Sequence, residues 1–422
     1  MNAIDASVPV FLDSNVKIEP LTFRWYAWSH LVSPVSLALN LAYRYLPMLK
    51  SFIANPGVHE AAAKNPKMLG GSFLELRQQD IGQVRALQQT MLQQGAALLG
   101  FADDLLALDR QLHKTETGFS LDHLYSKLPA SLAGMVEAGY DLNNRSSLRI
   151  AEELAYHDAQ LSVPAQEIGF SRTRDDMRNF FLNTPRLETQ ERLILPAAFA
   201  HACFDLLSAS RITPVPFGEL ADALGADAAV RERLRGYFQL EPPPRNAPEF
   251  HGEGVRLRYF GHACVLIQSN EVSILVDPFL TWDRDDAEGR LTFHDLPDHI
   301  DYVFFTHNHQ DHFSIEALLQ LRNRIGTILV PRNNANNLAD PSMKLTLQGI
   351  GHDKVRVMDP MDRVDFAGGR LTSLPFYGEH AVPAHHPACW THRLPFHRHG
   401  MRRGAAKLAL WPLPEQPDQP QG

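Results

Sequence analysis

Cysteine is scarce in this chain, with three residues among 422. Cys203, Cys264 and Cys389 are far apart and odd in number, which is typical of reduced thiols and not of a disulfide framework. Reduced thiols indicate a cytoplasmic protein. Cys264 lies in an apolar run, so we expect it to be a plain core residue.

Long apolar runs and excess positive charge are also missing. The most apolar early stretch, residues 31–49, is interrupted by two prolines, an asparagine and an arginine, so no transmembrane helix is expected there. Residues 1–16 carry two aspartates and no basic region, unlike a signal peptide. The formal net charge of -8 argues against a nucleic-acid partner held by phosphate contacts. We therefore expect neither a membrane nor a nucleic-acid partner.

The length and composition indicate a globular protein with two domains. A chain of 422 residues exceeds one ordinary domain of about 100–200 residues. Hydrophobic residues make up 44% and charged residues 21%, which allows sizeable cores. Residues 241–252 begin with three consecutive prolines and have the composition of a stiff linker. We therefore place an N-terminal domain at residues 1–240 and a second domain at 253–381.

The N-terminal domain has the periodicity of a mostly helical α/β domain. The clearest helix spans residues 81–108, where Val84, Met91, Leu98 and Leu105 recur every seven positions. Such a row packs into the core of its own chain or forms a homodimer interface, and the sequence favours the first. No metal cluster, phosphate loop or nucleophile motif occurs in this half.

Two further helical regions are predicted before the linker. Residues 188–208 read as one helix that Pro196 kinks or splits. Residues 216–240 read as two short helices separated by Gly225. Because the protein is acidic, we expect this helical pair to pack structurally and not to bind DNA.

One short stretch, Thr306–His312, carries the chemistry of the chain. It follows the apolar run 302–305 and contains three imidazoles and one carboxylate within six positions. A strand would deliver His307 and His309 to one metal ion, and Asp311 and His312 to a second. Imidazole and carboxylate ligands suit Zn, Fe or Mn, and open coordination positions would make the site catalytic.

Short strands are predicted around this loop. A helix is expected at residues 314–322, with Ser314 as its N-cap. The predicted strands are 255–259, 264–268, 272–276, 302–305, 327–330, 354–358 and 371–376.

Three segments together resemble the metallo-β-lactamase superfamily. They are Gly261-His262-Ala263 before a hairpin, residues 274–278, and the His-x-His-x-Asp-His loop. The resemblance implies an α+β class, with the mostly helical domain followed by a partial αββα sandwich. It also implies that Asp277 lies beneath the metal loop as a hydrogen-bonding neighbour of the ligands.

A narrower resemblance comes from Gly378-Glu379-His380, which is similar to the diiron β-hydroxylases of nonribosomal peptide pathways. In that group the glutamate is the ligand, which implies Glu379 as a ligand and His380 as its neighbour. A carboxylate in place of an imidazole favours iron. The resemblance further implies two iron ions, an aminoacyl substrate on a carrier protein (thiolation domain), and an electron donor.

Two other functions remain open on the sequence. If His380 were the ligand in place of Glu379, a hydrolase of an ester, lactone or phosphodiester with two Zn or Mn ions would be favoured. The third hypothesis is a non-catalytic product. Residues 382–422 have an abrupt change of composition and no convincing counterpart of the family's two later ligands, a bridging aspartate and a last histidine. We expect a truncation or frameshift near residue 381, which would remove these two ligands, and the non-catalytic hypothesis rests on that loss. A natural His-rich tail that binds metal is the alternative.

Overall fold

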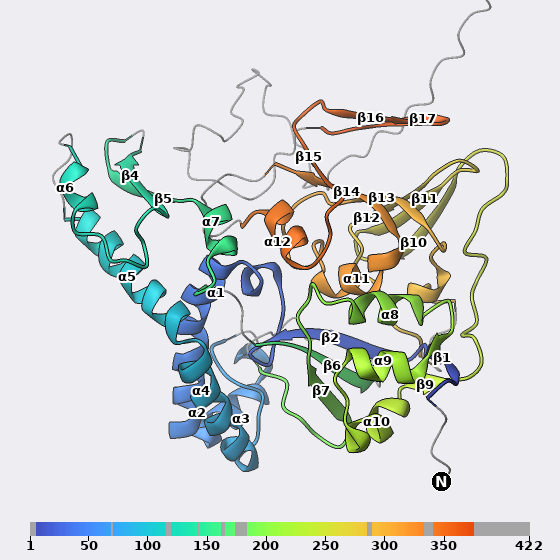
Figure 1. Cartoon of the computed structure of the whole chain (residues 1–422), viewed down its shortest axis with the longest axis horizontal. Coiled ribbons are helices and arrows are strands. Elements are labelled where there is room, and N and C mark those ends of the chain that lie inside the picture. The colour runs from blue at the N-terminus through green and yellow to red at the C-terminus, as the bar shows by residue number, and fades with distance from the viewer. Residues whose placement is uncertain are drawn as a thin grey trace, which may run out of the picture.

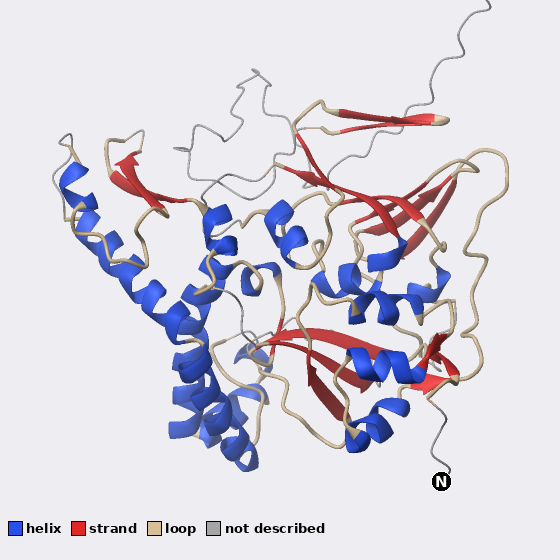
Figure 2. Ribbon diagram, in the orientation of Figure 1, coloured by secondary structure: helices blue, strands red, loops and turns tan. Residues whose placement is uncertain are grey.

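The computed structural model describes residues 6–68, 71–114, 120–141, 143–161, 165–173, 184–284, 289–332 and 341–374. Two β-sheets lie on opposite sides of a layer of helices, and a helical arm extends from one side (Figures 1 and 2). The mixed helix and sheet architecture that the sequence predicts is confirmed.

An antiparallel sheet forms the base of the N-terminal half, in the order β3-β2-β6-β7. Its central strand β2 pairs along its whole length with β6, from Val16 opposite Arg172 to Thr22 opposite Gln166. The strands are β2 (Val16–Thr22), β3 (Trp25–Tyr26), β6 (Gln166–Arg172) and β7 (Arg192–Pro196). A smaller sheet contains β1 (Pro9–Leu12), β8 (Val215–Pro216) and β9 (Phe238–Gln239).

The helical arm contains the predicted seven-residue pattern. The helix breaks at Gly95, where a Cβ atom would lie 2.5 Å from the carbonyl oxygen of Met91. The four patterned residues are all buried within this chain, so packing into its own core is confirmed. The arm contains α1 (Pro34–Asn40), α2 (Leu46–Ala54), α3 (Pro56–Ala63), α4 (Ile81–Gln94), α5 (Ala96–Leu112), α6 (Asp122–Tyr125), β4 (Val136–Tyr140), β5 (Ser146–Ile150) and α7 (Glu152–His157).

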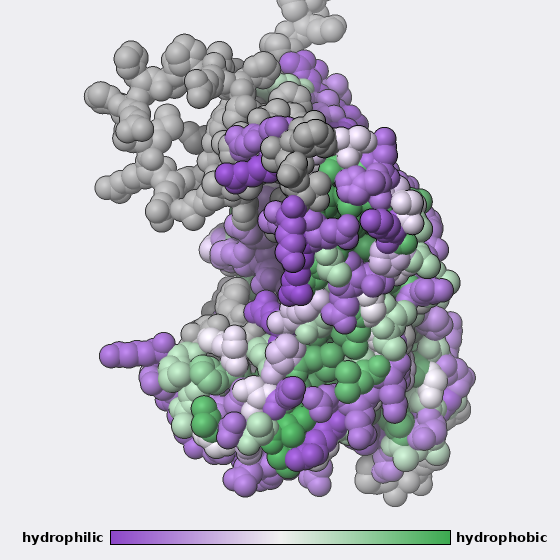
Figure 3. All heavy atoms as spheres, turned by 90° about the vertical axis from the view of Figure 1, so that its left-hand side faces the viewer, coloured by the Kyte–Doolittle hydropathy of each residue, from purple (hydrophilic) through white to green (hydrophobic). Residues whose placement is uncertain are grey.

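The outer face of this arm carries both hydrophilic and hydrophobic side chains (Figure 3). Figure 3 shows hydrophobic side chains in patches among the hydrophilic ones on this side of the molecule. Among the helices that the structure describes, none combines the length and the apolar character needed to span a bilayer.

The prediction of a helical region at residues 188–208, kinked or split at Pro196, is wrong in its first part. Arg192–Pro196 forms strand β7, and only Cys203–Ala209 forms a helix, α8. A short apolar run is ambiguous between helix and strand, and here Leu193–Leu195 pairs with β6. Since β7 is the edge strand, Pro196 is tolerated at its end.

The two short helices before the linker are confirmed. They are α9 (Phe217–Ala223) and α10 (Ala228–Arg235). Gly225, with φ +62°, makes the left-handed turn after α9, and the Asp227 side chain caps α10 by accepting from the Val230 amide.

The second half is built on a six-stranded sheet in the order β10-β11-β12-β13-β14-β15. The first three strands are antiparallel, and β12 to β15 run parallel. The six predicted strands of this sheet are confirmed, whereas the hairpin strand β16 was not predicted. The strands are β10 (Arg256–Gly261), β11 (Cys264–Gln268), β12 (Ser273–Val276), β13 (Ile300–Phe304), β14 (Ile325–Pro331), β15 (Val355–Met358), β16 (Arg363–Phe366) and β17 (Gly369–Thr372).

Helix α11 (Ile315–Gln320) lies between the two sheets and is buried on every side. Ser314 caps it as predicted, by accepting from the Ala317 amide. The polar residues that face the N-terminal sheet are satisfied there: Tyr26 donates to Glu316 at 2.6 Å, and Gln320 donates to the carbonyl of Ile18. Helix α12 (Met343–Gly349) lies near α7.

The other face of the six-stranded sheet begins a second layer. The hairpin β16–β17 covers part of it, where Val364 and Leu371 join a small core with residues of β11, β12 and β14. Along β10, Leu257 and Tyr259 remain exposed among the described residues, as does Val255 just before the strand. A second sheet would cover such a row in a sandwich.

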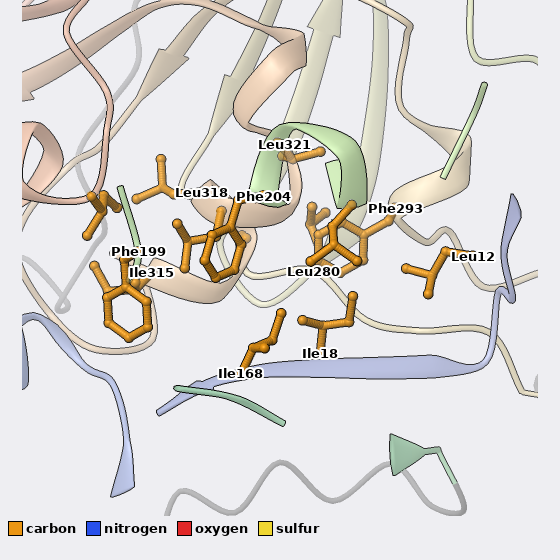
Figure 4. Close-up of a cluster of buried hydrophobic side chains, with 14 of the residues drawn as sticks. Leu12, Ile18, Ile168, Phe199, Phe204, Leu280, Phe293, Ile315, Leu318 and Leu321 are labelled. Carbon is orange, nitrogen blue, oxygen red and sulfur yellow. The ribbon is translucent and has the colours of Figure 1, made fainter. Parts of the chain in front are cut away.

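One hydrophobic core joins both halves of the chain. Ile18 and Ile168 of the N-terminal sheet pack toward Ile315 and Leu318 of α11, with Phe204 of α8 beside them (Figure 4). The N-terminal sheet therefore supports the helix that follows the metal loop.

Candidate metal centre

The predicted metal loop leaves the carboxyl end of β13, beside the carboxyl end of β12. These strands are parallel neighbours, with Val276 opposite Phe304, and the Asp277 amide donates to the Phe304 carbonyl at 2.9 Å. Ligand sites in α/β sheets form at the carboxyl ends of parallel strands. The loop then turns back, with the Phe313 amide donating to the His309 carbonyl at 2.8 Å.

Asp277 lies beneath this loop and fixes its shape. The residue is buried, with 1% of its surface exposed. It accepts from the Thr306 amide at 2.8 Å and from the Thr306 hydroxyl at 2.7 Å. It also pairs with Nδ1 of His312 at 2.8 Å, which directs Nε2 of that ring away from the carboxylate. Asp277 is therefore a hydrogen-bonding neighbour of His312, and the role of His312 as a metal ligand stays a prediction.

His307 and His309 converge as the sequence predicts. Nε2 of His307 lies 2.7 Å from Nδ1 of His309. Burial, together with the neighbouring rings of His312 and His309, lowers the pKa of His307 to about 4. At neutral pH this imidazole is therefore uncharged and offers a lone pair, as a metal ligand must.

Asp311 and His312 form a second group, and the structure adds a residue to it. Oδ2 of Asp311 lies 3.9 Å from Nε2 of His312 and 2.8 Å from Nε2 of His262. Ligand atoms of all three residues lie within 4.8 Å of one another. His262 was part of the sequence resemblance but was not predicted as a site residue.

The charge on His312 depends on opposing effects. Burial works to lower its pKa, but the hydrogen bond that the ring donates to Asp277, together with the charges of Asp277 and Asp311, outweighs burial and raises the pKa. A ring between two carboxylates attracts a cation, whether a proton or a metal ion.

The N-terminal half contributes to the surroundings of the loop. The Gln310 amide lies 3.2 Å from Nδ1 of His30. Tyr26, Trp28 and Phe279 form a small buried cluster, and Phe279 packs edge-on against His262 with ring centroids 5.9 Å apart. Residues from both halves therefore line the same region.

The predicted ligand Glu379 and its predicted neighbour His380 lie outside the described residues, as does the whole segment 382–422. The described donors nevertheless fit one or two divalent metal ions. They comprise four imidazoles and one carboxylate in two groups, and the half-buried His307 is neutral at neutral pH.

A parallel-strand edge that carries a His-x-His-x-Asp-His loop defines a metal-binding protein of the β-lactamase superfamily. The model of that superfamily domain matches residues 256–386. A second model, described as the diiron non-heme β-hydroxylase N-terminal domain, matches residues 11–242. The chain belongs to the diiron non-heme β-hydroxylase family.

Individual relatives agree with this assignment. The 4-amino-L-phenylalanyl-[CmlP-peptidyl-carrier-protein] 3-hydroxylase of Streptomyces venezuelae is 32% identical over 379 residues, which cover 87% of this chain and 70% of the relative. The crystal structure of the diiron β-hydroxylase CmlA from the same organism matches with a TM-score of 0.78 and 32% identity, covering 89% of this chain and 70% of that one. A UPF0173 protein of Pyrococcus abyssi is 29% identical over 126 residues, 30% of this chain and 50% of the relative.

Proposed function

We propose that this chain is an O2-dependent diiron monooxygenase that hydroxylates the β-carbon of an amino acid bound to a carrier protein. Family membership over both halves of the chain supports it. The Streptomyces venezuelae relative is named as a 3-hydroxylase of an aminoacyl group on a peptidyl carrier protein. The observation that carries the proposal is the division of the ligands into two adjacent groups, which suits two metal ions.

We assign His307, His309 and Glu379 to one iron, and Asp311 and His312 to the other. The domain assignment that goes with it is an N-terminal domain at 1–240, a linker at 241–252 and the metal domain at 253–381.

The residues of the chain bind and orient, while bound iron supplies reductive activation of O2. His307 is uncharged above about pH 4 and can coordinate without first losing a proton. Asp277 holds the His312 ring so that Nε2 faces Asp311. Tyr26, Trp28 and Phe279 form a buried aromatic cluster. This cluster is an apolar boundary beside the second ligand group, which contains His262, Asp311 and His312.

Hydroxylation inserts one oxygen atom of O2 into a C–H bond and reduces the other to water, which takes two electrons and two protons. The electrons must come from outside the substrate. We therefore infer an electron-donor protein as a second partner beside the carrier protein.

The experiment combines metal analysis with a product assay on the full chain. Iron at about a twofold molar ratio, with one oxygen atom added to an aminoacyl carrier protein under O2 and a reductant, is the expected result. His307→Ala should abolish the product, whereas His299→Ala, at an exposed histidine of the same domain, should not. Zinc with hydrolytic activity would favour the hydrolase, and protein that takes up no stoichiometric metal would favour the non-catalytic hypothesis.

A further inference from the structure

The second ligand group includes a residue from a different hairpin, and its backbone conformation is unusual. His262 occupies the two-residue turn between β10 and β11, where Gly261 pairs with Cys264. Its φ is +50°, in the left-handed region that glycine adopts at the least cost. Strained backbone conformations of this kind cluster at functional sites. At such a site the residue is needed for its side chain, although glycine would suit the backbone better.

The side chain of His262 points to the site. Its Nε2 lies 2.8 Å from Oδ2 of Asp311, and its ring centroid lies 5.1 Å from that of His312. Phe279 packs against its edge and limits the directions that the ring can take. The three ligand atoms therefore converge from a turn and a loop that the pairing of β10 to β13 holds together.

Two imidazoles and one carboxylate on one side of a site are the donor set of non-heme Fe(II) proteins. The His312 ring is already oriented by Asp277, so its Nε2 needs no rearrangement to coordinate. The Asp311 carboxylate supplies the negative charge that offsets part of a divalent cation's charge.

We propose that His262, Asp311 and His312 form a self-sufficient site for one divalent cation of the Fe(II) class. This site needs neither Glu379 nor any later residue of the chain. The inference rests on the proposed function only for the identity of the metal, because the three-residue geometry stands without it.

The test isolates this group in the full-length protein. A His307→Ala/His309→Ala parent lacks the other histidine pair, and it is titrated with Co2+ while the d–d absorption is recorded. We expect one equivalent to bind. Adding His262→Gly, which suits the positive φ, should weaken binding by more than about 100-fold, beyond the 10–100-fold loss typical of an outer partner. Adding His299→Ala to the parent should leave its Co2+ affinity unchanged.

A second variant separates a ligand from a positioning residue. In His262→Gln the amide can still donate to Asp311 but is a poor ligand, so it should bind Co2+ as weakly as His262→Gly. Binding by either variant within about threefold of the parent would overturn the proposal. A parent that binds no Co2+ would overturn it too, while the iron content and product assay of the unaltered chain decide the proposed function separately.

Discussion

Asp277→Asn should impair metal binding through a change of tautomer at His312. One carboxylate oxygen accepts from the Thr306 amide, and the other accepts from the Thr306 hydroxyl and pairs with Nδ1 of His312. An asparagine offers one oxygen and one NH2. If its NH2 group faces the Thr306 amide, two hydrogen-bond donors oppose each other and the Thr306 amide loses its acceptor. If it faces His312, the ring must place its proton on Nε2, the nitrogen that should bind the metal.

The size of the effect follows from these contacts. Loss of the partner that orients a ligating histidine typically costs 10–100-fold in metal affinity, which is about 1.4–2.7 kcal/mol. Because Asp277 is buried, the metal-free protein should also lose about 1.5–3 kcal/mol of unfolding free energy. Co2+ titration measures the first quantity, and urea unfolding with chelator present measures the second.

The matched control is Asp365→Asn, on the hairpin β16–β17, where the exposed carboxylate pairs with Arg370. It should change neither quantity appreciably. If Asp277→Asn binds Co2+ within about twofold of the unaltered chain, the tautomer reasoning is refuted.

Three further predictions concern stability. Glu19→Gln should lower the free energy of unfolding in urea by about 3–5 kcal/mol, because the buried positive charge of Arg186 then has no negative charge opposite it. The double change Glu19→Leu with Arg186→Met should lower it by less than either single change. Burial opposes ionisation of Glu19, but the charges of Arg186 and Lys17 outweigh it and lower its pKa from 4.5 to about 2. The ion pair therefore adds about 3 kcal/mol to the free energy of unfolding above pH 4.5, and this contribution is lost as the pH falls toward 2. Glu19→Gln should remove this part of the pH dependence of stability. A divalent metal at 100 times its dissociation constant should add about 2.7 kcal/mol to the unfolding free energy, and a chelator should reverse it; an unchanged melting temperature would contradict metal binding to the folded state.

The metal loop can be predicted from the sequence because four candidate ligands, three histidines and one aspartate, fall within six positions, so a single local conformation brings them together. His262 could not be assigned in the same way. It precedes the loop by a hairpin and a strand, and only the pairing order of the sheet brings it near Asp311. A histidine at the centre of a two-residue hairpin turn, where glycine or asparagine is usual, was the available indication.

The errors in the fold have a similar origin. At 192–196, three consecutive apolar residues carry no period, and only pairing with β6 decides that they form a strand. In α11, the sequence indicates a helix with one buried side, whereas Glu316 and Gln320 are buried too because a second sheet covers them. Local patterns do not contain that partner, which lies in the other half of the chain.

The position of α11 between two sheets has a consequence for folding and for the history of the chain. Its residues belong to a hydrophobic cluster that spans both family domains, so neither half can expose its side of α11 without losing core contacts. We expect a single cooperative unfolding transition across the linker. A recombination that removed the metal domain alone would uncover the β2–β6 surface, so we expect selection to keep the two halves together.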